Sequence, residues 1–245
     1  MSEQHAAWLA RMEQQSKAKQ AQFMNHIAGR LGHPRMTEKP EQPYRGAPSF
    51  WEQFNWTQTE KEEQFMKTFQ SVGGHTAKFS TLEQANEFIV QHCEELGAKY
   101  IVQHNDAYLL ESELNKRLAD KLPEAQISIW NTDQEKQWIK EAAQADVGIV
   151  VADYAVAYTG SIVTLSAANK GRSASLLPTV MYFIVPIDRL HTRLGEVLNQ
   201  FDELEREQLP AGIHFISGPS RSSDIENDLT IGVHGPGVVY ALLVG

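Results

Sequence analysis

A polar loop in the last hundred residues carries side chains suited to binding an anion. Residues 217–226 read Ser-Gly-Pro-Ser-Arg-Ser-Ser-Asp-Ile-Glu, and the Gly-Pro pair ends the strand expected at 213–216. Ser223 and Glu226 have the spacing of a capping box, which predicts that a short helix begins there. Backbone amides at a helix N-terminus favour negative charge, and Arg221 adds a fixed positive charge. A capped helix without a ligand is the alternative. The expected anion ligands are Ser217, Gly218, Ser220, Arg221 and Ser222.

A histidine follows in a glycine-rich segment. Residues 232–237 read Gly-Val-His-Gly-Pro-Gly, so the backbone around His234 can approach a neighbouring loop. An imidazole titrates near neutral pH, which makes His234 a candidate general acid or base beside Arg221, with Gly235 in the ligand-binding loop. The alternative is a loop histidine that only bonds backbone carbonyl groups.

Two further polar loops lie next to apolar segments. Thr159, Gly160 and Ser161 form a tight turn before a strand, and this turn either faces a ligand or is a plain hairpin turn. In the next loop, Lys170 and Arg172 put two cations beside serine hydroxyls. A guanidinium binds carboxylate or phosphate through two parallel hydrogen bonds. Arg172 is therefore the expected anion ligand of this loop, and a solvated turn is the alternative.

The elements that position these loops alternate between strand and helix. Thr57 with Glu60 and Thr81 with Gln84 match capping boxes, which predict helix starts at these two threonines. Short apolar runs between the helices predict strands. Their alternation predicts crossover units, a largely parallel sheet and one α/β domain. The predicted helices are 57–71, 81–97, 111–121, 133–145 and 187–206, and the predicted strands are 75–79, 100–102, 127–130, 147–151, 162–165, 181–185, 213–216 and 238–244.

An N-terminal arm precedes this domain. Residues 7–31 are rich in Gln, Lys and Ala and carry an interrupted apolar stripe, which predicts a helix. Four prolines within residues 34–48 exclude a regular helix or a central strand there. The chain is expected to divide into an arm, 1–56, and a domain, 57–245. Aromatic side chains near the end of the arm favour docking on the parent domain or on a second subunit over ligand stacking, which leaves self-association open. They are Phe50, Trp51, Phe54 and Trp56.

Composition excludes several classes of protein. The 245 residues include 31 acidic and 22 basic side chains, a net charge of −9, so nucleic acid is not an expected partner. No apolar run reaches the roughly 18 residues that a membrane span requires, and the polar start shows no secretory signal, so a cytoplasmic protein is expected. The single cysteine, Cys93, excludes a disulfide framework and a cysteine-ligated iron–sulfur cluster held by this chain alone. The nine scattered histidines predict no metal site.

These loops, in this order, resemble the lactate utilization protein C family, the small third component of the bacterial lactate utilization operon, which contains a LUD domain. The resemblance covers about residues 60–245. At Tyr158 the chain departs from the pattern, because many members carry an acidic residue there. The hydroxyl of a tyrosine, with a reference pKa of about 10, cannot replace a carboxylate as a base at neutral pH. The residues that carry the resemblance are Ala152-Asp153, Thr159-Gly160-Ser161, Arg172 with Ser175-Leu176-Leu177-Pro178, the 217–226 loop and the Gly-Val-His-Gly-Pro segment at 232–236.

The resemblance implies a three-layer α/β/α domain with a mostly parallel sheet, similar to the ribose-5-phosphate isomerase and CoA-transferase fold. It also implies a part in the oxidation of L-lactate to pyruvate, which allows growth on lactate, together with two iron–sulfur proteins of the same operon. Those partners hold the clusters, so this chain needs no cofactor of its own. Arg172 and Arg221 then bind the small anionic ligand, and His234 handles a proton. Ser220 and Ser222 donate hydrogen bonds to the same anion.

Two other hypotheses stay open. A free-standing enzyme or binding protein for a small phosphorylated or CoA-linked ligand would need no partners, by analogy with the fold. A structural or regulatory subunit would use the same loops as an interface. The sequence does not distinguish lactate from another small hydroxy acid, and it contains no Gly-x-Gly-x-x-Gly nucleotide fingerprint. The electron acceptor, the oligomeric state and whether this chain is itself catalytic are also open.

Overall fold

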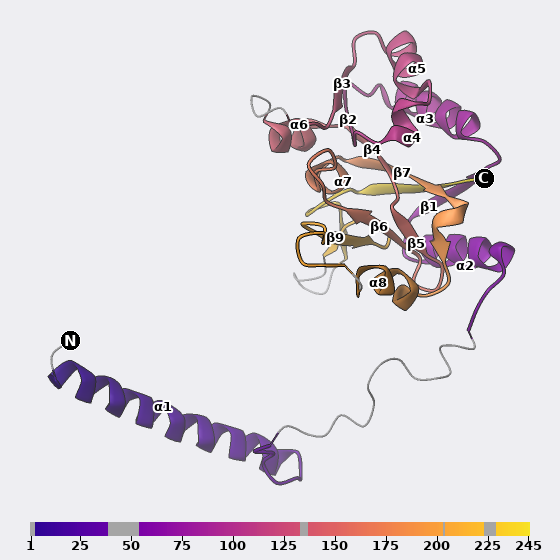
Figure 1. Ribbon diagram of the computed structural model, residues 1–245. Helices are drawn as coiled ribbons and strands as arrows, with labels where there is room; N and C mark the ends of the chain where they lie inside the picture. The colour runs from indigo at the N-terminus through magenta and orange to yellow at the C-terminus, as the bar shows by residue number, and fades with distance from the viewer. Residues whose placement is uncertain (1–2, 39–53, 133–136, 203, 223–228) are drawn as a thin grey trace. The chain divides into compact units, whose positions relative to one another are not determined.

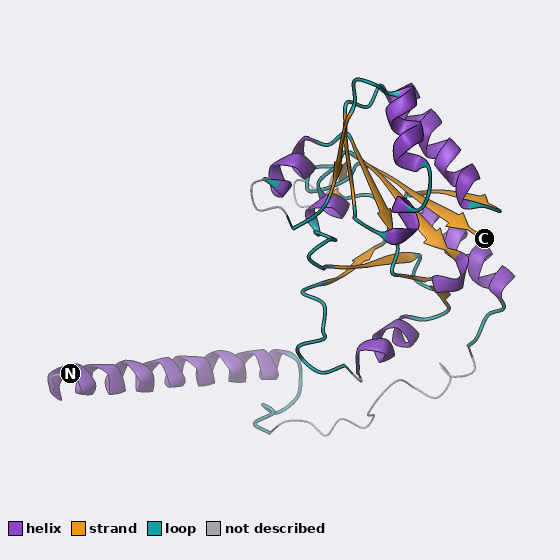
Figure 2. Ribbon diagram, turned by 45° about the horizontal axis from the view of Figure 1, so that its top comes forward, coloured by secondary structure: helices purple, strands orange, loops and turns teal. Residues whose placement is uncertain are grey.

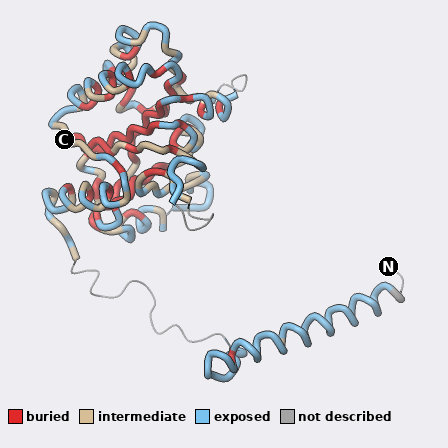
Figure 3. Tube along the Cα trace, turned by 180° about the vertical axis from the view of Figure 1, so that it is seen from behind, coloured by how far each residue is buried: buried red, intermediate tan, exposed pale blue. Residues whose placement is uncertain are grey.

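The chain divides into two compact units, Met1–Gln53 and Phe54–Gly245. The first unit contains α1 (Glu3–Arg30), whose residues are exposed along almost its whole length (Figure 3). This helix begins slightly before the predicted start. Within its apolar stripe, Trp8 is 46% exposed and Phe23 is 63% exposed. Pro40, Pro43, Pro48, Phe50 and Trp51 lie outside the described residues. The computed structural model describes residues 3–38, 54–132, 137–202, 204–222 and 229–245 (Figure 1).

The second unit is built on a six-stranded parallel sheet. Its strand order is β1-β12-β7-β4-β2-β3, and every neighbouring pair is parallel. Figure 2 shows the strands as a twisted fan with helices on both sides. The parallel sheet predicted from the alternation of elements is therefore confirmed. The six strands are β1 (His75–Phe79), β2 (Tyr100–Gln103), β3 (Gln126–Ile129), β4 (Val147–Val151), β7 (Val180–Pro186) and β12 (Val238–Val244).

Alternate residues of the central strands supply two separate cores, one on each face of the sheet. On β7, Tyr182 and Ile184 pack in one core, whereas Met181, Phe183 and Val185 pack in the other. Both faces are covered, which is why the strands read as continuous apolar runs. The result is the predicted three-layer α/β/α arrangement. One face carries α3 (Leu82–Leu96), α4 (Ala107–Leu110) and α5 (Leu114–Lys121); the other carries α2 (Gln58–Ser71), α6 (Trp138–Gln144) and α7 (Ser173–Leu176).

The first two helices of this unit begin at the predicted capping residues. The Thr57 hydroxyl accepts from the Glu60 N–H, and the Glu60 carboxylate accepts from the Thr57 N–H, which completes the capping box of α2. Thr81 caps α3 in the same way through the Gln84 N–H, but the Gln84 side chain accepts from the Ser80 N–H instead.

A second, smaller sheet covers part of the α2 face. Its order is β8-β5-β6-β9, in which β5 and β6 form an antiparallel hairpin. The tight turn at 157–161 is therefore a hairpin turn. The strands are β5 (Tyr154–Val156), β6 (Ser161–Leu165), β8 (Leu190–His191) and β9 (Ile213–Ile216), and a separate pair is formed by β10 (Arg221–Ser222) and β11 (Thr230–Ile231).

Two predicted helices differ from the observed ones. The helix predicted at 187–206 is wrong in its first part, because Ile187–Arg189 form a 3₁₀ turn and the next two residues pair with β5 as β8. The helix α8 (Leu194–Asp202) starts later, where Glu196 accepts from the Thr192 N–H. The helix predicted at 111–121 is observed as α5, which begins at Leu114, and the short helix α4 before it was not predicted. Residues 133–136 and 223–228, and with them the capping box of Ser223, lie outside the described residues.

The strand order creates a topological switch point between β2 and β4. The chain after β2 passes through α4 and α5 to β3 on one side, whereas the chain after β4 leads to β7 on the other side. The two connections therefore diverge at the carboxyl ends of two neighbouring strands. In open α/β sheets, this crevice is where ligands commonly bind.

Gly160 tests the packing of the hairpin turn against α2. Its φ is +58°, and a Cβ placed there would lie 2.8 Å from the backbone nitrogen of Phe69. We predict that Gly160→Ala lowers the free energy of unfolding by at least about 1 kcal/mol in urea titrations. Gly195→Ala on α8 is the control, because its Cβ would meet nothing within 4 Å; that change should stabilise by about 0.5–1 kcal/mol. Equal effects of the two changes would contradict the packing.

Candidate functional site

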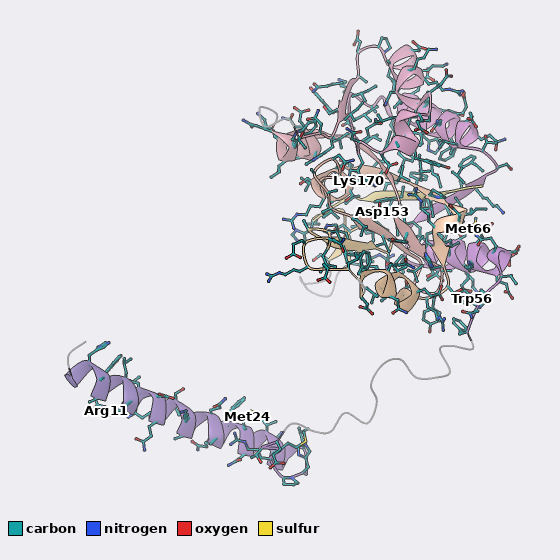
Figure 4. The ribbon with its side chains drawn as sticks, in the orientation of Figure 1. Arg11, Met24, Trp56, Met66, Asp153 and Lys170 are labelled. Carbon is teal, nitrogen blue, oxygen red and sulfur yellow. The ribbon has the colours of Figure 1, made fainter. Side chains whose placement is uncertain are left out.

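A largely buried ion cluster lies at the switch point. The Lys170 ammonium is 2.6 Å from Oδ2 of Asp106 and 3.0 Å from Oδ1 of Asp153. These three side chains are only 11–16% exposed. Figure 4 shows Lys170 and Asp153 next to each other within the second unit. One cation thus holds two carboxylates that come from different strand ends.

The local sequence explains how each member is placed. Asp106 follows β2 and caps α4, because its Oδ1 accepts from the Tyr108 N–H at 3.0 Å. Asp153 follows β4, and its Oδ2 accepts from the Leu165 N–H at 2.8 Å. Lys170 lies in the turn between β6 and α7, which is closed by backbone hydrogen bonds with Ala167. All four carboxylate oxygens of the cluster therefore have a donor.

The cluster keeps its charges at neutral pH. Burial alone would lower the pKa of Lys170, but the hydrogen bonds and charges of Asp106 and Asp153 outweigh it and hold that pKa above its usual value. Burial alone would raise the pKa of Asp106. The hydrogen bond and charge of Lys170 outweigh it, and the pKa of this carboxyl lies below its usual value. Lys170 is therefore an ammonium and not a neutral amine nucleophile.

His104 lies beside this cluster and is neutral. It is 1% exposed, and burial lowers its pKa to about 4. Its Nε2 is 3.1 Å from the carbonyl oxygen of Gly171, so Nε2 carries the proton and donates it. Nδ1 is then a buried acceptor without a partner among the described residues. This histidine ties the end of β2 to the turn that carries Lys170.

A cavity of about 460 Å³ opens onto the cluster. Asp153 and Lys170 line it, together with Ser166 and Ala167 of the following turn. The remaining wall comes from β5, β6, α8 and the segment after α8. This volume is within the range of small-molecule sites. The cavity therefore combines a switch-point position with a charged group that has a hydrogen to donate.

Arg172 lies near this cavity and away from Arg221, with which it was expected to bind the same anion. Its side chain is exposed and makes no hydrogen bond or ion pair within the described ranges. Burial lowers the pKa of His214, and the charge of Arg172 lowers it further. Nε2 of His214 is 2.8 Å from Oγ of Ser166, a residue that lines the cavity. Arg172 is thus an unpaired cation in the electrostatic surroundings of the cavity.

The predicted hydroxyl groups of two other loops meet each other. The Ser161 hydroxyl lies 2.8 Å from that of Thr159 and 2.7 Å from that of Ser217. Gly160 lies against α2, as described above. The structure therefore brings these two loops into contact, and their hydroxyl groups form hydrogen bonds with one another.

The rest of the predicted anion loop packs near the amino ends of β1, β7 and β12. The Ser220 N–H donates to the Pro236 carbonyl oxygen at 2.8 Å, and the Ser220 carbonyl oxygen accepts from the Gly232 N–H at 3.0 Å. A Cβ on Gly218 would lie 3.0 Å from the Val72 side chain, so this glycine packs against the end of α2. Gly235 lies close to Ser220. The backbone donor of Ser220 is thus used within the protein.

Arg221 and His234 are also placed at this end. The Arg221 guanidinium lies close to Gly73, and Ser222 pairs with Thr230 across β10 and β11. His234 lines a second cavity of about 570 Å³, formed largely by residues 231–237. The structure thus separates the sequence-predicted residues into Arg172 near the carboxyl ends of β2 and β4, and the others near the amino ends of the sheet.

Asp106 and His104 are the cluster residues that the sequence did not single out. Both belong to the polar run His-Asn-Asp that directly follows β2, and Asp153 stands in the same relation to β4. Polar residues directly after apolar strands are the signal that could have found them, because ligands bind at carboxyl strand ends in α/β sheets.

The aromatic residues at the start of the second unit dock on that unit. Phe54 and Trp56 have ring centroids 4.6 Å apart, and Phe54 lies edge-on to Tyr158 at 5.4 Å. The Trp56 N–H also donates to the Thr192 hydroxyl. Tyr158 therefore serves as a packing partner of this segment.

Cys93 belongs to α3 and is buried in the core, and burial raises the pKa of its thiol to about 12. Across the described ranges, no group of three or more His, Cys, Asp or Glu side chains is placed to hold a metal ion. Among the helices of those same ranges, none combines the length and the apolar character needed to cross a membrane.

Comparisons with known proteins match nearly the whole chain. The LUD domain family model matches residues 62–244. Lactate utilization protein C of Halalkalibacterium halodurans is 35% identical over 223 residues, which cover 87% of this chain and 92% of the relative. The protein of the same name from Shouchella clausii is 34% identical, with the same shares. The crystal structure of a DUF162 family protein from Deinococcus radiodurans has a TM-score of 0.56 at 19% identity, covers 78% of this chain and 99% of that chain, and shows the fold alone.

The low pKa of His104 predicts a pH dependence of stability. The unfolded chain binds a proton at this histidine near pH 6.5, whereas the folded chain does so only near pH 4. Stability is therefore lost as the pH falls from about 6.5 toward 4. Between pH 7 and pH 5, urea titrations should show about 2 kcal/mol less loss for His104→Gln than for the wild type. His75→Gln, at an exposed histidine of β1, should keep the wild-type loss. The same loss in all three proteins would contradict the neutral buried imidazole.

Proposed function

Because the chain belongs to the LUD domain family, together with the lactate utilization protein C sequences that it matches, we propose that it acts in the oxidation of L-lactate to pyruvate. It does so as the component without a cluster, beside two iron–sulfur proteins of the same operon. The observation that carries this proposal is the match over 87% of this chain and 92% of the relative from Halalkalibacterium halodurans. A shared activity is favoured by a match that includes nearly the whole of both proteins.

The chemistry of the reaction supports a division of labour. Conversion of the 2-hydroxyl group of lactate to a carbonyl removes the hydroxyl proton and the C2 hydrogen, and thus two protons and two electrons. The only cysteine of this chain is buried in the core, with its thiol pKa raised to about 12. The electrons therefore pass to the clusters of the partner proteins, while this chain binds the acid or assembles the complex.

The loops at the amino ends of the sheet suit the docking of those partners. The hydroxyls of Thr159, Ser161 and Ser217 bond one another, and the Ser220 N–H donates to Pro236. Leu229, Ile231 and Val233 nearby are each more than half exposed, and Arg221 pairs with Ile231 across β10 and β11. An exposed apolar group beside a cation is typical of an interface core. We assign Arg221 and the 229–233 segment to this interface.

The function is tested first by deletion of the gene. The deletion strain should fail to grow on L-lactate as sole carbon source and should grow normally on glucose, and the wild-type gene on a plasmid should restore growth. Normal growth of the deletion strain on lactate would refute the proposed function. The purified chain should be inert alone and should support lactate oxidation when the two cluster proteins are added. Turnover by the chain alone would favour a free-standing enzyme.

The interface is tested by Arg221→Ala, with Arg206→Ala as the control at another exposed arginine. Tagged Arg221→Ala should recover at least about fivefold less of both cluster proteins from lactate-grown cells, because a charged contact at an interface is lost. Arg206→Ala should recover as much as the wild type. An intact complex that no longer binds the acid would instead make Arg221 a ligand-binding residue.

A further inference from the structure

The cavity beside Lys170 has one donor that none of the described residues uses. The ammonium carries three hydrogens, and two of them go to Asp106 and Asp153. The remaining oxygen of each carboxylate accepts from a backbone N–H, so neither carboxylate has a free oxygen to accept the third hydrogen. Lys170 lines the cavity of about 460 Å³. The third hydrogen is therefore available to an acceptor within that cavity.

Two arginines lie near the ion cluster and the cavity. Lys170 and Arg189 face Asp106 and Asp153: Arg189 acts on Asp106 through its charge and donates to the Ala152 carbonyl oxygen at 2.7 Å. These two pairs of charges cancel. Arg172 adds a further positive charge, without an ion-pair partner in the part of the chain that the structure describes. A negatively charged group in the cavity would therefore be attracted by Lys170 and by Arg172.

His104 is neutral and adds no charge to these surroundings. Its imidazole is held in the electrostatic surroundings of Lys170, Asp153 and Asp106, and it donates from Nε2 to the Gly171 carbonyl oxygen. A second buried cation at this place would compete with Lys170 for the two carboxylates. The uncharged ring instead fixes the turn that presents Lys170 to the cavity.

We propose that this cavity binds a small 2-hydroxy or 2-oxo monocarboxylate, whose carboxylate accepts from Lys170 and is balanced by Arg172. The negative charge of the ligand follows from the remaining hydrogen of the Lys170 ammonium and from the nearby Arg172, and the oxygen on its second carbon rests on the proposed function. The acid is thus bound at the carboxyl ends of β2 and β4, away from the loops assigned to the interface.

The size of the cavity predicts that it accepts acids with side groups of different sizes. Its other walls include Tyr154 and Phe201, whose rings are perpendicular with centroids 6.1 Å apart, and Gln200 of α8. The Gln200 amide donates one hydrogen to the Glu196 carbonyl oxygen, and the Ser166 hydroxyl bonds Nε2 of His214. The second amide hydrogen of Gln200 and the remaining hydrogen-bonding position of the Ser166 hydroxyl are left for the oxygen on the second carbon. The aromatic pair provides apolar contact for the remainder. Acids with a larger group than the methyl of lactate should therefore bind as well as lactate does.

The test blocks the cavity from its exposed rim. Ala167 lines the cavity and is exposed, whereas Ala168 is exposed and does not line it, so Ala167→Trp fills the space and Ala168→Trp is the matched control. Calorimetry on the purified full chain should show binding of pyruvate, L-lactate and 2-hydroxybutyrate, and no binding of L-lactamide, which lacks the charge. Ala167→Trp should weaken pyruvate binding at least about tenfold, and Ala168→Trp should change it less than twofold. Equal affinities of the two tryptophan variants would overturn the assignment.

The charge requirement is tested separately. Arg172→Met should weaken pyruvate binding at least about threefold and reduce its dependence on salt, while Lys140→Met, at an exposed lysine of α6, should leave both unchanged. Lys170→Met should abolish binding; thermal unfolding of the same sample shows whether that variant is folded. If the Lys170→Met variant is unfolded, the result for Arg172→Met decides the test. Wild-type affinity in Arg172→Met would overturn the role of Arg172 in attracting the anion.

The outcomes separate this inference from the proposed function. If the deletion strain fails to grow on lactate but the wild-type chain binds none of the three acids, the ligand assignment is wrong and the function stands. If the chain binds pyruvate through the cavity but the deletion strain grows normally on lactate, the pathway is wrong and the site stands.

Discussion

The bridge from Lys170 to Asp106 and Asp153 is the interaction on which the arrangement around the switch point depends. The two carboxylates come from the ends of neighbouring strands, β2 and β4, and would repel each other without the ammonium between them. Loss of one partner from a buried ion pair costs about 3–5 kcal/mol. This bridge, the hydrogen bond of His104 to Gly171 and the paired backbones of residues 105 and 169 together hold the β6–α7 turn on the sheet. The shape of the adjoining cavity follows from that turn.

Much of the fold could be predicted because the relevant signals are local. The strands β4 and β7 are buried on both faces, and this burial requires continuous apolar runs. Thr57 forms the capping box that its spacing indicates. The second sheet was harder, since β5 and β8 have only three and two residues, too few to show a period of two. Ile187, Leu190 and Leu194 moreover have helix-like spacing, although the first two belong to a 3₁₀ turn and a strand.

The candidate site could be predicted only in part, because strand order is not a local property. Lys170 stood out as a cation in a polar loop, but its partner Asp106 is 64 residues away along the chain and meets it only because β2 and β4 are neighbours. Conversely, the loop around Ser220 has the local pattern of an anion site. Tertiary contacts override that pattern, since the carbonyl oxygen of Pro236 accepts the Ser220 N–H. The pattern identified residues that matter for the fold, whereas the position of the ligand depends on the order of the strands.

The central claim is that a small carboxylate is held at the switch point by Lys170. A crystal structure of the full chain grown with pyruvate tests this claim most directly, because it places the bound acid among the residues of both ends of the sheet. The account predicts a pyruvate carboxylate oxygen within about 3 Å of Nζ of Lys170, in the cavity bordered by Asp153 and Ser166. Pyruvate bound instead beside His234 and Arg221, with the Lys170 cavity free of it, would contradict the account.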